Sequence, residues 1–317
     1  MKLLITGGAG FIGSNTAEYF YNNGHDVYIL DNLSTGKIEN IPFIPDDHFL
    51  NIDIREYNKV ESLIKEHQFD VIIHFAAVVS VVDTINDPIT SNEVNIVATL
   101  KLLEFNRKHN KNIKKIVFAS SAAIYGNDPI LPKCVNSAVR PESPYAIQKY
   151  AGEQYLRVYS KLYGLPTVQL RFFNVYGPKQ NPKSPYSGAL SIMKERFDSN
   201  GKFIFNGDGL QSRDFVYVKD VVKAITIVID SNEAIGNIYN VGSGKANTLL
   251  TVFEIFKKNY NKEIEFEFAE ERLGDVKHSL ADISDLQGLG YTSSYDVVKG
   301  LSEYLAIEKE NKKVQEA

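Results

Sequence analysis

The stretch TGGAGFIG, residues 6–13, decides the fold of this 317-residue chain. The apolar run Lys2–Thr6 precedes it and a helical pattern follows it, so the glycines stand at a turn from a strand into a helix. Glycines let the backbone approach a pyrophosphate closely, and the helix behind them points its first amides at it. Asp31 stands 18 residues after Gly13, where a carboxylate accepts hydrogen bonds from ribose hydroxyls and repels a 2′-phosphate. The pattern predicts a dinucleotide site that prefers NAD to NADP. Lys37 is the one nearby charge that points the other way, because a lysine would suit the 2′-phosphate of NADP.

The rest of the first half alternates short apolar runs with amphipathic helical patterns, which is typical of a parallel sheet covered on both faces. The expected strands are Lys2–Thr6, Asp26–Leu30, His48–Ile52, Asp70–Phe75, Lys114–Ser120 and Thr167–Arg171. The expected helices include Tyr57–His67, Ile89–His109 and Pro144–Tyr163, the last capped by Ser143. We therefore predict an α/β fold, a Rossmann-type doubly wound parallel sheet with a smaller α+β substrate-binding domain.

The character of the sequence changes after about Tyr176. Residues 177–188 carry three prolines and indicate a long loop, and such loops in compact domains are often functional. A smaller mixture of helices and short strands follows, including Ile264–Phe268. We predict a Rossmann domain over 1–175, completed by a strand near 237–242, and a mainly substrate-binding domain over 176–317.

Composition excludes several classes of protein. The formal net charge of −4 argues against a nucleic-acid or anionic-membrane surface. No apolar run approaches the roughly 18 residues that a membrane span needs, and the N-terminus does not have the pattern of a signal peptide. The single cysteine, Cys134, cannot form an internal disulfide, which suits a reducing cytoplasm. From these features we expect a cytoplasmic protein. No Cys or His cluster has metal-ligand spacing, so we expect no metal site.

Tyr145 and Lys149 stand four residues apart on the helix predicted over 144–163, so their side chains share one face. An ammonium group beside a phenol favours the phenolate, which suits a general base. The helix follows the strand that ends at Ser120, so both residues lie beside the carboxyl ends of the strands, where ligands bind, and the Ser121 hydroxyl could reach the same substrate oxygen. The spacing recurs at Tyr295 and Lys299, which we interpret as an ordinary surface pair.

Further motifs continue along nearly the whole chain. They are HFAA (74–77), SSAAIYG (120–126), SPYAIQKYAGE (143–153), RFFNVYGP (171–178), GDGLQSRDFVYVKD (207–220) and RLGDVKHSLAD (272–282). With TGGAGFIG, they resemble the extended short-chain dehydrogenases that modify nucleotide sugars, and most of all the bacterial and archaeal UDP-hexose 4-epimerases. The resemblance implies NAD as cofactor, a UDP-sugar as substrate bound mainly by 176–317, and a homodimer through the helices over 89–109 and 144–163.

The resemblance also implies roles for individual residues. The catalytic set would be Ser121, Tyr145 and Lys149. The NAD site would comprise Gly7, Gly10, Phe11, Ile12, Gly13, Asp31, Asn32, Asp53, Ile54, Ala76, Ala77, Asn95, Ser120, Tyr145 and Lys149. The substrate site would comprise Ser80, Ser121, Tyr145, Asn174, Arg213, Arg272, Asp275 and Ser279. This assignment is chemically reasonable, because guanidinium groups pair bidentately with phosphate oxygens and a carboxylate suits ribose hydroxyls. We interpret His74 as a core residue at a strand end.

The expected reaction is epimerisation of a UDP-hexose at C4 through a 4-keto intermediate. Dehydratases of this family carry an Asp-Glu pair directly after the hydroxyl residue, and decarboxylases usually carry a Glu two residues before Tyr-Gly; here Ala122 and Ala123 occupy those positions and cannot transfer protons. A UDP-glucuronate 4-epimerase is the alternative, because a carboxylate-binding Arg or Lys could lie in the 177–188 loop. A cofactor-sensing regulator that is not an enzyme is the alternative from another class, and the complete set of Ser121, Tyr145 and Lys149 disfavours it.

The resemblance implies that the choice of sugar depends on the residue seven positions after the Arg of RxGD. In the 4-epimerases that this chain resembles, a tyrosine there restricts the enzyme to UDP-glucose and UDP-galactose, while a small residue leaves space for a 2-acetamido group. Here that residue is Ser279. We therefore expect UDP-N-acetylglucosamine and UDP-N-acetylgalactosamine to be accepted.

Overall fold

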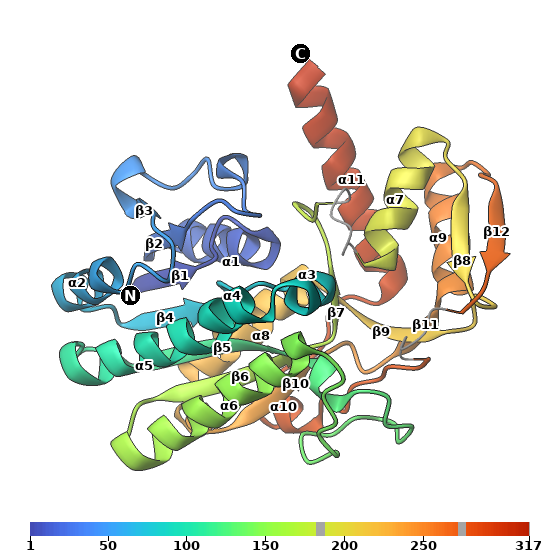
Figure 1. The fold of residues 1–317 in the computed structure, drawn as a ribbon. Helices are drawn as coiled ribbons and strands as arrows, with labels where there is room; N and C mark the ends of the chain where they lie inside the picture. The colour runs from blue at the N-terminus through green and yellow to red at the C-terminus, as the bar shows by residue number, and fades with distance from the viewer. Residues whose placement is uncertain (182–187, 272–276, 317) are drawn as a thin grey trace.

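Seven parallel strands form the centre of the larger part of the molecule (Figure 1). The computed structural model describes residues 1–181, 188–271 and 277–316, with side chains up to residue 310. In spatial order the strands are β10 (Ile238–Val241), β6 (Thr167–Phe172), β5 (Lys115–Ser121), β4 (Val71–His74), β1 (Lys2–Thr6), β2 (Asp26–Asp31) and β3 (Phe49–Asn51). Strands β1 to β3 run outward from the centre, and the chain then crosses back to β4 on the other side of β1. Ligands bind at such a switch in strand order, so the fold places a site beyond the ends of β1 and β4.

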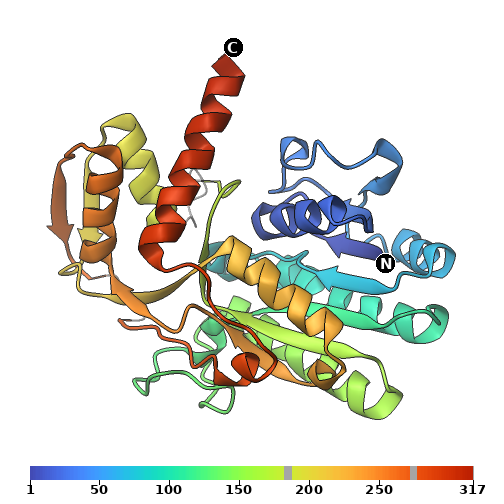
Figure 2. The same ribbon diagram turned by 180° about the vertical axis from the view of Figure 1, so that it is seen from behind.

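Helices cover both faces of this sheet (Figure 2). Alternate residues of β1 face opposite ways, so Leu3 and Ile5 belong to one buried cluster and Leu4 to another. The first cluster includes residues of α1 (Phe11–Asn22) and α8 (Val218–Asp230). The second includes residues of α2 (Tyr57–His67), α5 (Ala98–His109) and α6 (Pro144–Tyr163). These layers confirm the predicted doubly wound α/β fold.

A smaller lobe follows β7 (Asn174–Tyr176) and lies beside the large sheet (Figure 1). Its strands form two small sheets, one of β11 (Ala246–Thr248), β9 (Ser212–Tyr217) and β7, the other of β12 (Phe266–Ala269) and β8 (Phe203–Asn206). Its helices are α7 (Ala189–Ser199), α9 (Leu249–Tyr260) and α11 (Val297–Glu316). Aromatic side chains, among them Phe197, Phe205 and Phe253, fill the core between them.

The chain returns to the large sheet after it has built most of the small lobe. Helix α8 covers one face of the sheet, and β10 pairs with β6 at its edge. Helix α10 (Ser284–Gly288) lies beside β10. No helix in the described ranges is long and apolar enough to cross a membrane.

The helix predicted over Ile89–His109 is interrupted. The structure has α4 (Pro88–Asn92), one π-helical turn at Glu93–Val97, and then α5. Asp87 caps α4 by accepting a hydrogen bond from the Thr90 amide. The π-helical turn contains Asn95, whose side chain is fully engaged in hydrogen bonds described below, and such turns are frequent at functional sites. Helical periodicity alone predicts neither of these breaks.

Candidate functional site

The glycine turn after β1 forms one wall of a cavity of about 510 Å³. Gly7 adopts φ +69°, and a Cβ there would lie 2.7 Å from the Ala76 nitrogen. A Cβ on Gly13 would lie 2.3 Å from the Gly7 carbonyl oxygen. Both positions therefore require glycine, and the turn brings the start of α1 to the cavity. A helix N-terminus next to exposed backbone fits the pyrophosphate of a dinucleotide.

Asp31, at the end of β2, lines this cavity and also holds the glycine turn in place. Its carboxylate accepts hydrogen bonds from the backbone amides of Ala9 (2.9 Å) and Leu33 (2.8 Å). Burial raises the pKa of Asp31, and the two amide hydrogen bonds counteract the effect. Each carboxylate oxygen keeps a free lone pair for a ribose hydroxyl. Lys37 is exposed and does not line the cavity.

Asp53 forms the far end of the same cavity. Its carboxylate pairs with both Nε (2.9 Å) and an NH2 group (2.8 Å) of Arg55 and accepts a hydrogen bond from Asn32 (2.8 Å). The Arg55 guanidinium holds the pKa of Asp53 well below its usual range. Sequence reasoning missed Arg55, although it also lines the cavity.

The opposite wall follows β4 and includes Ala76, Ala77 and Val78. Asn95, expected in this wall, does not line the cavity and is buried behind it. Its amide accepts a hydrogen bond from the Val78 nitrogen (2.8 Å) and donates to the Val78 oxygen (3.0 Å) and to Gln148 Oε1 (2.7 Å). Asn95 therefore holds the backbone of Val78 in position as a neighbouring strand would.

The predicted catalytic residues Ser121, Tyr145 and Lys149 all line this cavity. Ser121 ends β5, and Tyr145 and Lys149 project from α6, whose first turn is capped by the Ser143 hydroxyl at 3.2 Å from the Ala146 amide. The Lys149 ammonium donates to the Ala119 carbonyl at 2.8 Å and lies 5.9 Å from the centre of the Tyr145 ring. Burial lowers the pKa of Lys149 to about 8.

The structure corrects one expectation about Tyr145. We expected the lysine to lower the pKa of the phenol, but burial raises this pKa, and the group that lowers it is the Ser121 hydroxyl. The physical reason is that both side chains are removed from water and the ammonium is directed to a carbonyl oxygen.

Ser120, beside the catalytic set, belongs to a buried polar network. Its hydroxyl donates to Glu153 Oε1 at 2.6 Å, and Glu153 pairs with Arg171 through two contacts of 2.8 Å. Because the serine proton is committed to the carboxylate, its oxygen faces the cavity as an acceptor. Sequence reasoning missed Glu153, which stands four residues after Lys149 on the same helix face.

His74 lies in the core, as interpreted from the sequence. Its ring nitrogens lie 2.6 Å from Thr6 Oγ1 and 3.0 Å from Thr99 Oγ1. Burial lowers the pKa of His74 to about 3, so the ring is neutral at physiological pH.

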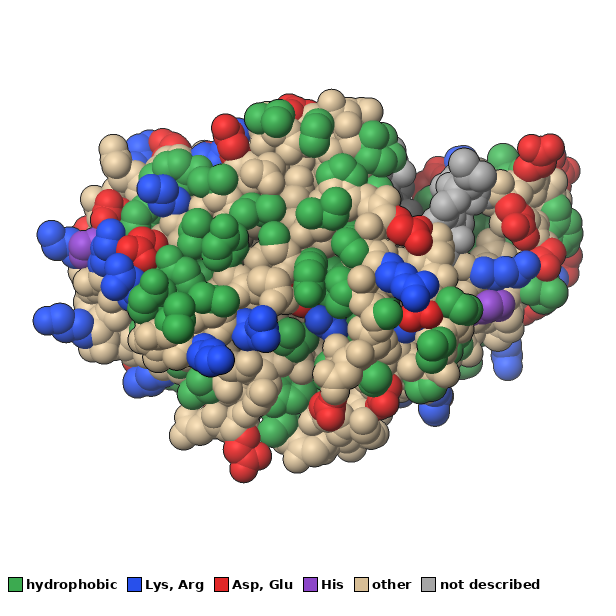
Figure 3. All heavy atoms as spheres, turned by 60° about the horizontal axis from the view of Figure 1, so that its bottom comes forward, with side chains coloured by type: hydrophobic (Ala, Val, Ile, Leu, Met, Phe, Trp, Pro, Cys, Tyr) green, Lys and Arg blue, Asp and Glu red, His purple; other side chains and the backbone are tan. Residues whose placement is uncertain are grey.

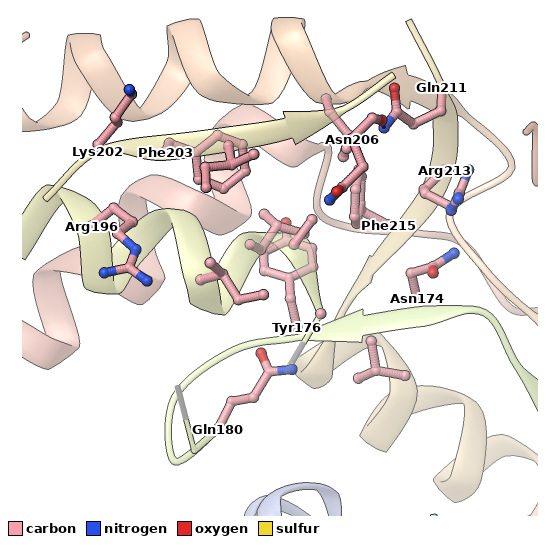
Figure 4. A pocket seen from close by; sticks show the side chains of 17 residues that line it. Asn174, Tyr176, Gln180, Arg196, Lys202, Phe203, Asn206, Gln211, Arg213 and Phe215 are labelled. Carbon is pink, nitrogen blue, oxygen red and sulfur yellow. Dashed lines mark hydrogen bonds between the residues drawn. The ribbon is translucent and has the colours of Figure 1, made fainter. Parts of the chain in front are cut away.

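A second cavity, of about 660 Å³, lies within the small lobe and is lined by residues of β7, α7, β8 and β9 (Figure 4). Asn174 and Arg213 line it, as predicted for the substrate site. Asn174 donates to the Asp214 carbonyl (3.2 Å), and Arg213 donates to the carbonyls of Ser212 (3.0 Å) and Lys277 (3.1 Å). Sequence reasoning missed several other lining residues, namely Gln180, Leu190, Arg196, Lys202, Phe203, Ile204 and Gln211.

The remaining substrate-site predictions fall outside both cavities or outside the described residues. Ser80 is buried and caps α3 (Val81–Asn86) by accepting from the Asp83 amide at 2.8 Å. Ser279 is half-buried, with its amide donating to the Ser212 carbonyl at 3.0 Å, beside Arg213. Arg272 and Asp275 lie outside the described residues.

The two cavities meet at Val175 and Gln180, which line both. A ligand in the first cavity and a ligand in the second would therefore touch near the end of β7. This arrangement suits a reaction between a dinucleotide and a second extended molecule. Among the described residues, no group of three or more His, Cys, Asp or Glu side chains could hold a metal ion.

Comparison with known proteins identifies relatives of the whole chain. The model of the NAD dependent epimerase/dehydratase family matches residues 3–242. A provisionally named UDP-glucose 4-epimerase of Methanocaldococcus jannaschii is 38% identical over 98% of this chain and 99% of its own. A Methanobrevibacter ruminantium UDP-N-acetylglucosamine 4-epimerase, solved with UDP-N-acetylmuramic acid, superposes with a TM-score of 0.91 at 36% identity over 98% of both chains. A Thermus thermophilus UDP-glucose 4-epimerase complex with NAD superposes with a TM-score of 0.87 at 36% identity over 96% of this chain and 98% of that one.

Proposed function

Because this chain belongs to the NAD-dependent epimerase/dehydratase family and is an NAD-dependent UDP-sugar 4-epimerase, we propose that its substrates are UDP-N-acetylglucosamine and UDP-N-acetylgalactosamine, with UDP-glucose and UDP-galactose as further substrates. The observation that carries the choice of sugar is Ser279. This small side chain is half-buried, and its amide is bonded to Ser212, next to Arg213, which lines the second cavity. The resemblance places one wall of the sugar site at the position of Ser279. A similar structure, that of the Methanobrevibacter ruminantium enzyme, is named for UDP-N-acetylglucosamine.

The first cavity fits NAD, which when bound would supply a hydride acceptor and a positive charge at its nicotinamide ring. The glycine turn and the start of α1 would hold the pyrophosphate, and Asp31 a ribose. The Asp31 carboxylate would also repel the 2′-phosphate of NADP.

Three side chains of this chain would carry the proton chemistry at C4 of the sugar. Tyr145, as phenolate, would take the proton of the C4 hydroxyl, so that the sugar can give its C4 hydride to bound NAD and become a 4-ketone. Ser121 would hydrogen-bond the same oxygen, and its hydroxyl is the group that lowers the pKa of the phenol. Lys149 would stay beside the Tyr145 ring, held by its hydrogen bond to the Ala119 carbonyl. After the ketone turns over within the cavity and regains the hydride on its opposite face, Tyr145 would return the proton to the C4 oxygen. Nothing is consumed, so the cofactor can stay bound.

The UDP group would anchor the substrate while the sugar turns over. Arg213 and Asn174 lie on one side of the second cavity and the Phe203 ring lies on the other (Figure 4), and the apolar Leu190 also lines the cavity. A guanidinium suits the diphosphate, and an apolar slot suits a base. Arg272 and Asp275 remain predicted contacts of the nucleotide.

The UDP-glucuronate alternative requires a cation for the sugar carboxylate. Lys179, one of two lysines in the 177–188 loop, pairs instead with Glu18 at 2.7 Å and lines neither cavity. The other, Lys183, lies outside the described residues. The position of Lys179 favours the uncharged sugars.

We also propose that the enzyme is a homodimer. Exposed apolar side chains gather on the face over α3, α4 and α6, which Figure 3 shows near its centre. They are Val81, Val82, Ile85, Ile89, Ile147, Tyr155, Val158 and Leu162. Contiguous patches of this kind mark interfaces, and a two-fold axis would pair the patch with itself.

The test of the sugar assignment uses purified protein with each UDP-sugar, its products resolved by NMR. We expect interconversion of the two N-acetylated sugars, and Ser279→Tyr should abolish that reaction while sparing UDP-galactose turnover, because the larger ring occupies the acetamido space. Native enzyme that is inert on UDP-N-acetylglucosamine but active on UDP-glucose or UDP-glucuronate would contradict the assignment.

A further inference from the structure

The start of the 177–188 loop is fastened to the large sheet domain. Asn15 of α1 donates to the Pro178 carbonyl at 3.1 Å. The Lys179 ammonium contacts Glu18 at 2.7 Å and the Asn40 carbonyl at 3.0 Å. Lys179 also adopts a left-handed backbone conformation, with φ of 69°. These contacts hold the backbone just before Gln180 against the large sheet domain, and so fix where the Gln180 side chain starts.

Gln180 lies where the two cavities meet. Among the described residues, it is the polar residue that lines both cavities. Figure 4 shows it on the edge of the second cavity that faces the N-terminal part of the chain, across from Lys202. Its Oε1 is shielded from solvent and accepts no hydrogen bond from any described residue. Native proteins rarely leave a buried amide oxygen without a donor, because the lost hydration is not replaced.

A ligand bound in either cavity can supply that donor, because Gln180 lines both. At neutral pH, phosphate oxygens only accept hydrogen bonds, so they suit the amide nitrogen of Gln180 and not its oxygen. Ribose and hexose hydroxyls can donate, so they suit Oε1. A side-chain amide with one donor face and one acceptor face can therefore serve a phosphate and a hydroxyl at the same time.

We propose that the Gln180 amide is a contact shared by NAD and the UDP-sugar, donating to a phosphate oxygen of one and accepting from a hydroxyl of the other. The inference rests on the proposed function, since it takes these two ligands as the occupants. A side chain held in place by the first ligand loses less freedom when the second binds, so the two affinities become coupled. Such coupling is reciprocal, so each ligand tightens the other by the same factor.

The experiment measures the affinity for UDP by calorimetry, and the rate of NAD loss with and without UDP, in native protein and in Gln180→Met. Methionine keeps the length of the side chain and removes both hydrogen-bonding faces. We expect UDP affinity to fall by about twofold to tenfold, the usual range for one hydrogen bond, and NAD to dissociate faster. The slowing of NAD loss by UDP should disappear in the variant.

Gln169→Met is the matched control. The Gln169 Oε1 is also buried and accepts no hydrogen bond from any described residue, but this side chain lies on β6 and lines neither cavity. This variant should leave NAD retention, and its dependence on UDP, as in native protein.

The inference is overturned if Gln180→Met binds both ligands like native protein, or if it weakens only one of them. Thermal unfolding of both variants distinguishes these outcomes from a loss of folding. The measurement uses UDP and NAD alone, so it remains decisive even if no UDP-sugar is epimerised, a result that would sink the proposed function instead.

Discussion

Tyr145 and Tyr295 share one local pattern, a lysine four residues later, but lie in different surroundings. Tyr145 faces the first cavity with Lys149 buried beside it. Tyr295 precedes α11 and stacks under the exposed Lys299, 4.3 Å from its ring centre. Burial and the neighbouring Glu303 raise the pKa of Tyr295 to about 12, which disfavours the phenolate. The pattern alone does not define a general base; its place at the end of the sheet does.

Tyr145→Phe should therefore lower turnover by roughly a hundredfold or more, the usual scale of a lost general base. UDP binding should survive, because in the proposed mechanism the phenol oxygen acts on the sugar and not on the nucleotide. The measurement is steady-state epimerisation together with UDP calorimetry. Tyr295→Phe serves as the control and should retain native turnover; equal effects of the two substitutions would show that the base is misassigned.

At the scale of elements, the π-helical turn at Glu93–Val97 gives the cavity a wall that no strand supplies. It places Asn95 so that three hydrogen bonds link the turn to Val78 and to Gln148 of α6. Helix α6 carries Tyr145 and Lys149, so one side chain connects the wall of the dinucleotide cavity to the catalytic helix.

Asn95→Leu should destabilise the protein by about 1–3 kcal/mol, because the Val78 backbone groups lose their partners. It should also lower the amount of NAD that copurifies, measured after heat release, because the wall beside the cofactor loosens. Asn106→Leu is the matched control on α5. Asn106 is equally buried and bonds to Leu102 and Asn110, and it does not line the cavity. A similar loss of NAD in both variants would mean that stability alone is responsible.

The sequence predicted the sheet and the glycine turn because these depend on local patterns. Helices α2 and α6 have the predicted ends, since Ser143 and Pro144 mark the start of α6 and Gly164 follows its end. The break in the helix over 89–109 was not predictable, because it depends on the partners of Asn95, Val78 and Gln148, which lie far apart in the sequence. Gln180, Arg55 and Glu153 were missed for the same reason: each acquires its role from tertiary contacts.

At the scale of the whole molecule, the apolar face over α3, α4 and α6 is exposed to solvent in a single chain. Along α6, Ile147, Val158 and Leu162 are each at least 40% exposed, and Ile89 of α4 is 73% exposed. In a monomer this apolar face stays in contact with water and contributes no stability. A second copy would bury the face against its own identical face. The division of labour between residues 1–175 and 176–317 stays a prediction, although the return of α8 and β10 to the large sheet ties the two parts together.

Light scattering coupled to gel filtration should therefore give twice the 35.6 kDa mass of the chain. Val158→Glu should shift this mass to that of the monomer, because association would bury an unpaired carboxylate within the apolar face. Ile130→Glu is the control, since Ile130 is 69% exposed but lies in the loop before α6, outside the apolar face. A native protein that elutes as a monomer, or a Val158→Glu variant that remains dimeric, would place the interface elsewhere. The predicted catalytic residues Ser121, Tyr145 and Lys149 all line a cavity within one chain, so a monomeric variant that keeps its fold should also keep its turnover.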